Sequence, residues 1–237
     1  MLSMHSLLQR CRQLLFALLF ILAVAWLFGF GAQWLLRWRA EKLLAGIRAL
    51  QVDRGTWSDA QQLAQKWSQW ATSKPGCTSD SCTVEIGLVQ TLPPILVAQS
   101  GARNWLPSLA DHIGLRSVAA RAGFTVEHGV VTSKYFGEQT TLPVRDLGSP
   151  DDYTPYLSAS SAETVHFREI VGDSKIAHPN RMAQHLNYYL QITFSPDEDP
   201  AEQSALMDFR FSCLTQLRPC ETEAEILPEG ASMIQQH

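Results

Sequence analysis

The feature that most constrains this chain is an uninterrupted apolar run near its N-terminus, LLFALLFILAVAWLFGFGA, at residues 14–32. A helix of these 19 residues is about 28 Å long, close to the ~30 Å hydrocarbon thickness of a bilayer. A buried core helix of this length rarely lacks a polar face. The run therefore predicts a transmembrane anchor, followed by a globular domain of roughly 190 residues.

A cleaved signal peptide is the main alternative to an anchor that stays in the protein. Gly29-Phe30-Gly31 offers small residues at the spacing of a cleavage site. However, the apolar helix continues beyond them through residues 33–36, and the whole run is long for a signal peptide. We therefore interpret the run as a signal anchor, so the protein is expected to cross the membrane once.

The residues after the apolar run predict how the anchor meets the domain. Trp34 and Trp38, with Arg37 and Arg39 beside them, are typical of a membrane interface. Apolar residues then continue at helical spacing as far as Leu50. We assign residues 1–36 to a cytoplasmic tail and anchor, 37–55 to a helical stem and 56–237 to an extracytoplasmic α+β domain.

Charge is divided unevenly between the anchor and the domain. The first 50 residues hold six basic residues and one acidic residue, while residues 51–237 hold 13 basic and 22 acidic residues. An acidic domain repels phosphate backbones, which argues against nucleic-acid binding. The basic residues around the anchor would be attracted to anionic head groups, so the lipid bilayer is an expected partner.

Four cysteines form two close pairs, Cys77 with Cys82 and Cys213 with Cys220, whereas Cys11 precedes the anchor. An even count in local pairs favours disulfides, which persist outside the cytoplasm. Three connectivities are open, and we prefer local pairing because each pair closes a short loop with turn residues. A zinc site and four free thiols remain as alternatives.

Two features of the sequence disagree about which side of the membrane the domain occupies. Basic residues are more numerous after the anchor than before it, which by the positive-inside rule favours a cytoplasmic domain. The cysteine pairs favour the opposite side. We give more weight to the cysteines and expect the domain on the outer, periplasmic side of a bacterial inner membrane.

The remaining patterns predict an α+β domain with a small helical segment followed by a mostly antiparallel sheet. A helix over 57–71 is expected after a cap at Thr56 or Ser58, with an aromatic stripe facing the core. His128-Gly129 predicts the turn of a hairpin. Period-two alternation predicts strands at 83–89, 116–127, 130–136, 163–171, 188–194 and 207–214. Short helices are expected at 105–112, after Asp199-Pro200 and at 222–227, with a long loop over 137–162.

No motif for catalysis or cofactor binding is present. A metal or acid–base site built from His166, His178 and His185 is conceivable, but surface or singly buried histidines explain them more simply. Whether the protein is an enzyme stays uncertain, with the balance against it. We therefore name no catalytic residue, no cofactor and no metal ligand.

Three segments resemble an uncharacterised family of single-pass, membrane-anchored bacterial envelope proteins. They are LLAGIRALQVDRGTWSDAQQLAQKW, the CTSDSC loop and FSPDEDPAEQSALMDFRFSCLTQLRPCETEAEILP. The resemblance covers most of the chain and implies an anchor and cysteine pairs, but no activity. From the residues we expect an extracytoplasmic binding or interaction domain with an envelope protein as its partner. An envelope enzyme of unrecognised type and a cytoplasm-facing anchored domain are the alternatives.

Overall fold

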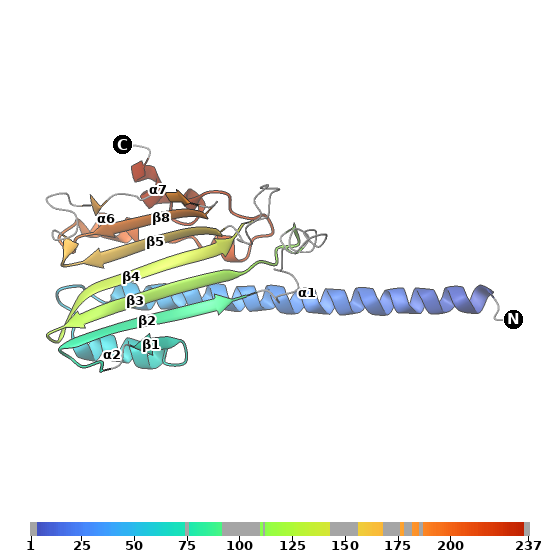
Figure 1. The fold of residues 1–237 in the computed structure, drawn as a ribbon, viewed down its shortest axis with the longest axis horizontal. Helices are drawn as coiled ribbons and strands as arrows, with labels where there is room; N and C mark the ends of the chain where they lie inside the picture. The colour runs from blue at the N-terminus through green and yellow to red at the C-terminus, as the bar shows by residue number, and fades with distance from the viewer. Residues whose placement is uncertain are drawn as a thin grey trace.

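One long helix, α1 (Met4–Ala49), organises the whole molecule (Figure 1). In this computed structural model, residues 4–73, 76–91, 110, 112–142, 156–167, 176–177, 182–184 and 187–234 are described. The N-terminal half of α1 projects from the domain, and its C-terminal half lies across a β-sheet. Within the described ranges it is the one helix long and apolar enough to cross a membrane, and no residue of its most apolar segment is buried in the domain. The predicted α+β class is therefore confirmed, and the chain has a helix that could serve as the predicted anchor.

The sheet runs in the order β1-β2-β3-β4-β5-β8-β6, and β7 also pairs with β8. Neighbouring strands are antiparallel except β5 and β8, which are parallel. The bounds are β1 (Ala71–Ser73), β2 (Ser81–Gln90), β3 (Val118–Glu127), β4 (Val130–Thr141), β5 (Tyr156–Thr164), β6 (Ile176–Ala177), β7 (Met182–Gln184) and β8 (Asn187–Phe194). The predicted mostly antiparallel sheet is therefore confirmed.

The core lies between α1 and one face of this sheet. Small residues on β3, such as Ala120 and Ala122, are completely buried, so the helix can approach the central strands closely. Leu43 and Ile47 of α1 are also completely buried. Each such side chain stabilises the fold by roughly 1.5–3 kcal/mol. The stem is thus part of the domain core, and buried residues on α1 begin as early as Gln33.

The β3–β4 hairpin confirms the turn predicted at His128-Gly129. Both residues have positive φ, 51° and 82°, as a two-residue hairpin turn requires. A register irregularity follows at Thr125/Val126. Beyond it, alternate β4 side chains face α1 up to Thr140, so β4 is longer than the predicted strand over 130–136.

The predicted helix over 57–71 is shorter than expected, because α2 spans only Trp57–Lys66. Thr56 and Asp59 form the capping box at its start. Trp67 is buried with its ring 5.5 Å from that of Trp70, so the aromatic stripe belongs to the core. The chain then turns and enters β1, a strand the alternation did not reveal because it has three residues.

Two predicted strands are wrong. Residues 207–214 pair with no strand among the described residues; the segment ends in the 3₁₀ helix η2 (Phe211–Leu214). Its alternating Phe209 and Phe211 instead place their rings against Phe136 of β4, with centroids 4.9 and 5.7 Å away. Of the strand expected over 163–171, only 163 and 164 lie in a strand, which is β5 (Tyr156–Thr164); a turn follows at 165–166, and 168–171 lie outside the described residues. The serine-rich composition of residues 156–162 favours a loop, and the sequence therefore does not predict the first part of β5.

The C-terminal part closes the domain with short helices. The capped helix predicted after Asp199 is α6 (Pro200–Leu206), and Asp199 accepts a hydrogen bond from the Ala201 amide. The helix expected at 222–227 is reduced to the 3₁₀ turn η3 (Glu223–Glu225), and α7 (Pro228–Ile234) was not predicted. Most of the helix expected at 105–112, and 143–155 of the long loop, lie outside the described residues.

Candidate functional site

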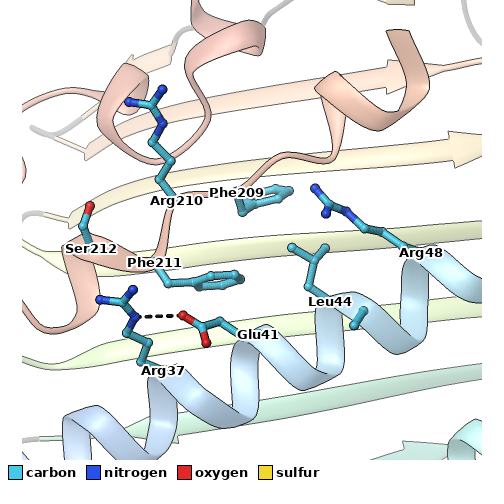
Figure 2. A pocket seen from close by; sticks show the side chains of 9 residues that line it. Arg37, Glu41, Leu44, Arg48, Phe209, Arg210, Phe211 and Ser212 are labelled. Carbon is cyan, nitrogen blue, oxygen red and sulfur yellow. Dashed lines mark hydrogen bonds and ion pairs between the residues drawn. The ribbon is translucent and has the colours of Figure 1, made fainter. Parts of the chain in front are cut away.

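A cleft of about 690 Å³ lies between α1 and the segment that follows α6 (Figure 2). We refer to it as the helix cleft. It forms because residues 207–212 run beside α1 without pairing to the described strands, which leaves part of the helix uncovered. Its lining residues are Arg37, Glu41, Leu44, Ala45 and Arg48 of α1 with Phe209, Arg210, Phe211 and Ser212.

The floor of the helix cleft is apolar. The rings of Phe209 and Phe211 point toward α1, on the side where Leu44 projects (Figure 2). Both rings are held from below by their edge contacts with Phe136, and both are about 5% exposed. A ligand lying in the cleft would therefore meet an apolar surface suited to an aliphatic or aromatic group.

The rim of the helix cleft is charged. Arg37 donates from Nε to Oε1 of Glu41 at 2.9 Å and from Nη1 to the Thr215 hydroxyl at 3.0 Å. Arg48, at the other end, pairs with Asp208 at 3.1 Å and donates to the Met207 carbonyl. Both arginines stay partly exposed, with side-chain accessibilities of 30% and 38%. Guanidinium groups at both ends could receive carboxylate or phosphate oxygens.

Arg210 adds a third guanidinium on the outer edge of the cleft. Its backbone is fixed by a hydrogen bond from its N–H to the Ile226 carbonyl at 2.8 Å. Its side chain is exposed and extends away from α1 in Figure 2. It therefore increases the positive charge of the rim without contacting the floor.

A carboxyl group is buried near Arg37 on the helix-facing side of β4. Glu138 is 1% exposed, and neither of its oxygens has a hydrogen-bond partner among the described residues. Burial raises its pKa well above 4.5, while the nearby Arg37 charge acts in the opposite direction. Burial therefore favours the protonated, neutral form of Glu138.

The wall opposite α1 is braced by a disulfide loop. Cys213 is bonded to Cys220, and Cys77 to Cys82, so the preferred local pairing is present. Arg116, which is 1% exposed, donates to the carbonyls of Gln216 and Leu217 inside this loop at 3.1 and 2.8 Å. The brace holds the segment that carries the cleft phenylalanines.

Removing that brace should destabilise the domain. Closing a loop of eight residues lowers the conformational entropy of the unfolded chain, which stabilises the folded state by about 2–3 kcal/mol. Cys213→Ser/Cys220→Ser should therefore lower the free energy of unfolding by that amount. Urea denaturation followed by tryptophan fluorescence measures it. Cys11→Ser is the matched control, because Cys11 is exposed and unbonded; an equal loss in the control would contradict the expectation.

Of the four predicted interface residues, the two tryptophans are exposed and the two arginines contact the domain. Trp34 and Trp38 are 51% and 56% exposed. The Arg37 guanidinium lies 5.3 Å from the centre of the Trp34 ring and also contributes to the cleft. Arg39 lies 4.9 Å above the ring of Trp70, so it helps to attach α1 to the segment after α2. Both arginines therefore contact the folded domain as well.

The histidines provide little support for a catalytic or metal site. His166 lies after β5 with Nε2 2.9 Å from Oε2 of Glu127, at the end of the sheet far from the projecting helix. His178 and His185 lie outside the described residues. Within the described ranges, no three histidine, cysteine or acidic residues gather as metal ligands would.

No pattern in the sequence indicates that Arg48, Phe209 and Arg210 line a common cleft. They lie on two segments more than 150 residues apart, and only the packing of one against the other forms the cleft. The alternation of Phe209 and Phe211 predicts a strand. The two phenylalanines can be recognised in the sequence as an apolar pair on either side of an arginine. However, nothing in the sequence indicates that they pack beside α1.

The fold and its cleft define an α+β domain fixed to the end of a single helix that could span a membrane. No known protein family matches this chain, and no curated protein or solved structure is similar to it. Its function therefore has to be inferred from the geometry of the chain itself.

Proposed function

We propose that this protein is a single-pass, membrane-anchored binding protein whose extracytoplasmic domain holds an acidic partner segment in the helix cleft. The observation that carries the proposal is the cleft itself, which combines a buried phenylalanine floor with arginines at both ends of the exposed helix face. An apolar anchor point with a charged rim is the usual anatomy of a protein-binding patch.

The chemistry of the rim indicates what the partner segment contains. The domain around Arg37, Arg48 and Arg210 is acidic, with 22 acidic against 13 basic residues over 51–237, Arg210 included. Long-range attraction of anions is therefore weak, and recognition depends on close contact. The fitting ligand is a peptide segment of another envelope protein with one large apolar side chain beside a carboxylate.

The disulfides support the outer side of the membrane. Both pairs are bonded, and such bonds persist in oxidising compartments. With a bacterial inner membrane as the host, residues 1–13 are cytoplasmic and the domain is periplasmic. Cys11 then lies on the reducing side, where a free thiol is stable.

Topology is tested by thiol labelling in intact cells with a membrane-impermeant maleimide. A Ser204→Cys variant places an exposed thiol on α6. We expect this introduced thiol to be labelled at once, Cys11 only after the membrane is opened, and the four paired cysteines only after reduction. Labelling of Cys11 but not of the introduced thiol would place the domain in the cytoplasm and overturn the proposed location.

Binding is tested with a photo-crosslinking residue at Ala45, an exposed position in the cleft. We expect discrete crosslinks at Ala45 that fall about tenfold in Arg48→Gln/Arg210→Gln, since losing two charge contacts removes at least ~1.4 kcal/mol of binding. Arg54→Gln/Lys66→Gln is the matched control, because it removes two exposed charges outside the cleft lining. Equal crosslinking in all three backgrounds would contradict cleft binding.

A further inference from the structure

The domain contacts the helix within the apolar run itself. The indole N–H of Trp26 donates to the Ile113 carbonyl at 2.9 Å, and the Gln90 amide donates to the Gly29 carbonyl at 3.3 Å. A Cβ on Gly29 would lie 2.8 Å from the Leu115 side chain, so the chain passes close to the helix there. These contacts fix the height of the domain along the anchor.

The length of the apolar run indicates how deep in a membrane these contacts would lie. If the whole domain stood in water, the hydrocarbon layer would have to end before Trp26. The apolar residues left, 14–25, would span only about 18 Å of the ~30 Å required. Residues 26–32 must therefore lie in the membrane, and the parts of the domain bonded to them must reach the same depth.

The exposed apolar side chains of the domain gather at this level. Among the described residues outside α1, the large hydrophobic side chains that are exposed are Val89, Ile113, Val130 and Leu217. Val89 precedes Gln90 at the end of β2, Ile113 is bonded to Trp26, and Leu217 lies against Gly114. Only Val130 lies elsewhere, beside the hairpin turn at the far end of the sheet. We call the other three the membrane-facing tip.

At the same level, the side-chain nitrogens of Gln33 and Gln90 bond within the protein, whereas the Oε1 atom of each has no hydrogen-bond partner among the described residues. Gln33 is fully buried, and its side-chain nitrogen donates to the Arg116 carbonyl at 3.2 Å. The Arg116 guanidinium is in turn covered by the carbonyls of the disulfide loop. Polar groups that enter an apolar layer need such internal partners. Packing against the domain therefore lets this end of the helix carry a glutamine at the edge of the apolar run.

We propose that the membrane-facing tip, Val89, Ile113 and Leu217, inserts into the boundary between lipid head groups and acyl chains and seats the domain on the bilayer. The inference rests on the membrane anchoring of the proposed function. Arg37 follows Ala32 by five residues, about 7.5 Å along the helix, which is the depth of a head-group layer. The Arg37 end of the helix cleft then opens at the membrane surface.

The test measures depth with an environment-sensitive nitrobenzoxadiazole label on single cysteines. The full chain, in a Cys11→Ser background with its disulfides intact, is reconstituted in phosphatidylcholine–phosphatidylglycerol vesicles. The labelled positions are Ile113→Cys and Leu217→Cys at the tip, Phe20→Cys in the anchor and Ser204→Cys on α6. Quenching by lipids that carry a nitroxide near the head group or deep in the acyl chain reports the depth of each label.

We expect blue-shifted emission and quenching by the shallow nitroxide at both tip positions. The label at position 20 should be quenched by the deep nitroxide, and the one at 204 should emit as in water. Water-like emission at both tip positions, with position 20 still quenched, would overturn the seating while the anchor stands. Loss of quenching at position 20 would overturn the anchor itself.

A second copy of the chain is the rival occupant of the tip. In that case the tip labels would be blue-shifted but not quenched by any nitroxide lipid, and the shift would weaken as the protein-to-lipid ratio falls. That result would also overturn the seating. Persistence of the shift at high dilution, with lipid quenching, supports the bilayer as the occupant.

Discussion

Lys134→Met is expected to lower the free energy of unfolding by about 3–5 kcal/mol, because it leaves a buried carboxylate without its partner. Lys134 and Glu163 are cross-strand neighbours on β4 and β5, on the face covered by α1. Their charged atoms are 3.0 Å apart and both side chains are 7% exposed. Lys134 also donates to the Leu50 carbonyl just after α1 ends.

The reason for the large effect is that the pair is costly to bury and more costly to break. Lys134→Met/Glu163→Leu should therefore recover most of the loss, since an apolar pair replaces both charges at similar volume. Urea denaturation of the full chain in detergent micelles measures the free energy of unfolding of the natural chain, the single variant and the double variant. Arg218→Met, which breaks the exposed Arg218–Glu221 pair, should leave stability nearly unchanged. A loss in Lys134→Met no larger than in this control would contradict the interpretation.

The ion pair also bears on how α1 joins the domain. Lys134 ties the end of α1 to the sheet, while Arg48 ties the last turn of α1 to Met207 and Asp208. The helix is therefore fixed at its C-terminal end as well as at Trp26 and Gly29. A helix held at both ends of the domain transmits its position in the membrane to the helix cleft, as the proposed seating requires.

Local signals were sufficient for much of the fold. The apolar run and the His128-Gly129 turn depend on residues close in sequence and are predicted from it, as is a helix cap at either Thr56 or Ser58, of which the structure uses Thr56. Strands β2 and β8 have the alternation expected when one face is buried, whereas β3 is buried on much of both faces. Such features need no knowledge of the partner element.

The errors occurred where distant packing decides the conformation. Residues 207–214 alternate like a strand, but their phenylalanines pack onto Phe136 and the Cys213–Cys220 bond turns the chain back. Strand β5 was hidden because its inward residues, such as Ala159 and Ser161, are small and its composition resembles a loop. The helix cleft could not be predicted, since it requires Arg48 and Phe209 to be brought together by the whole fold.

Glu138→Gln is expected to remove a pH dependence of stability that the natural chain shows above pH 4.5. Burial raises the pKa of Glu138 well above 4.5 in the folded protein, and in the unfolded chain the carboxyl titrates near its usual value. Between these two pKa values the folded state holds a proton that the unfolded state has released. The contribution of Glu138 to stability is therefore fully present below pH 4.5 and is lost, by about 1.4 kcal/mol per unit, as the pH rises toward the pKa of the folded state.

The difference between the two proteins isolates this carboxyl from every other titrating group. The free energy of unfolding of each is measured from pH 4 to 8 by urea denaturation, and the values are subtracted at each pH. Their difference should be constant near pH 4 and should shift in favour of Glu138→Gln as the pH rises through the window above 4.5. A pH-independent difference would mean that Glu138 is ionised in the folded protein and that Arg37, despite its own bonds to Glu41 and Thr215, neutralises it. The floor of the interface between α1 and β4 would then carry a charge pair, and the free positive charge at the Arg37 end of the helix cleft would be smaller than the proposed anion binding requires.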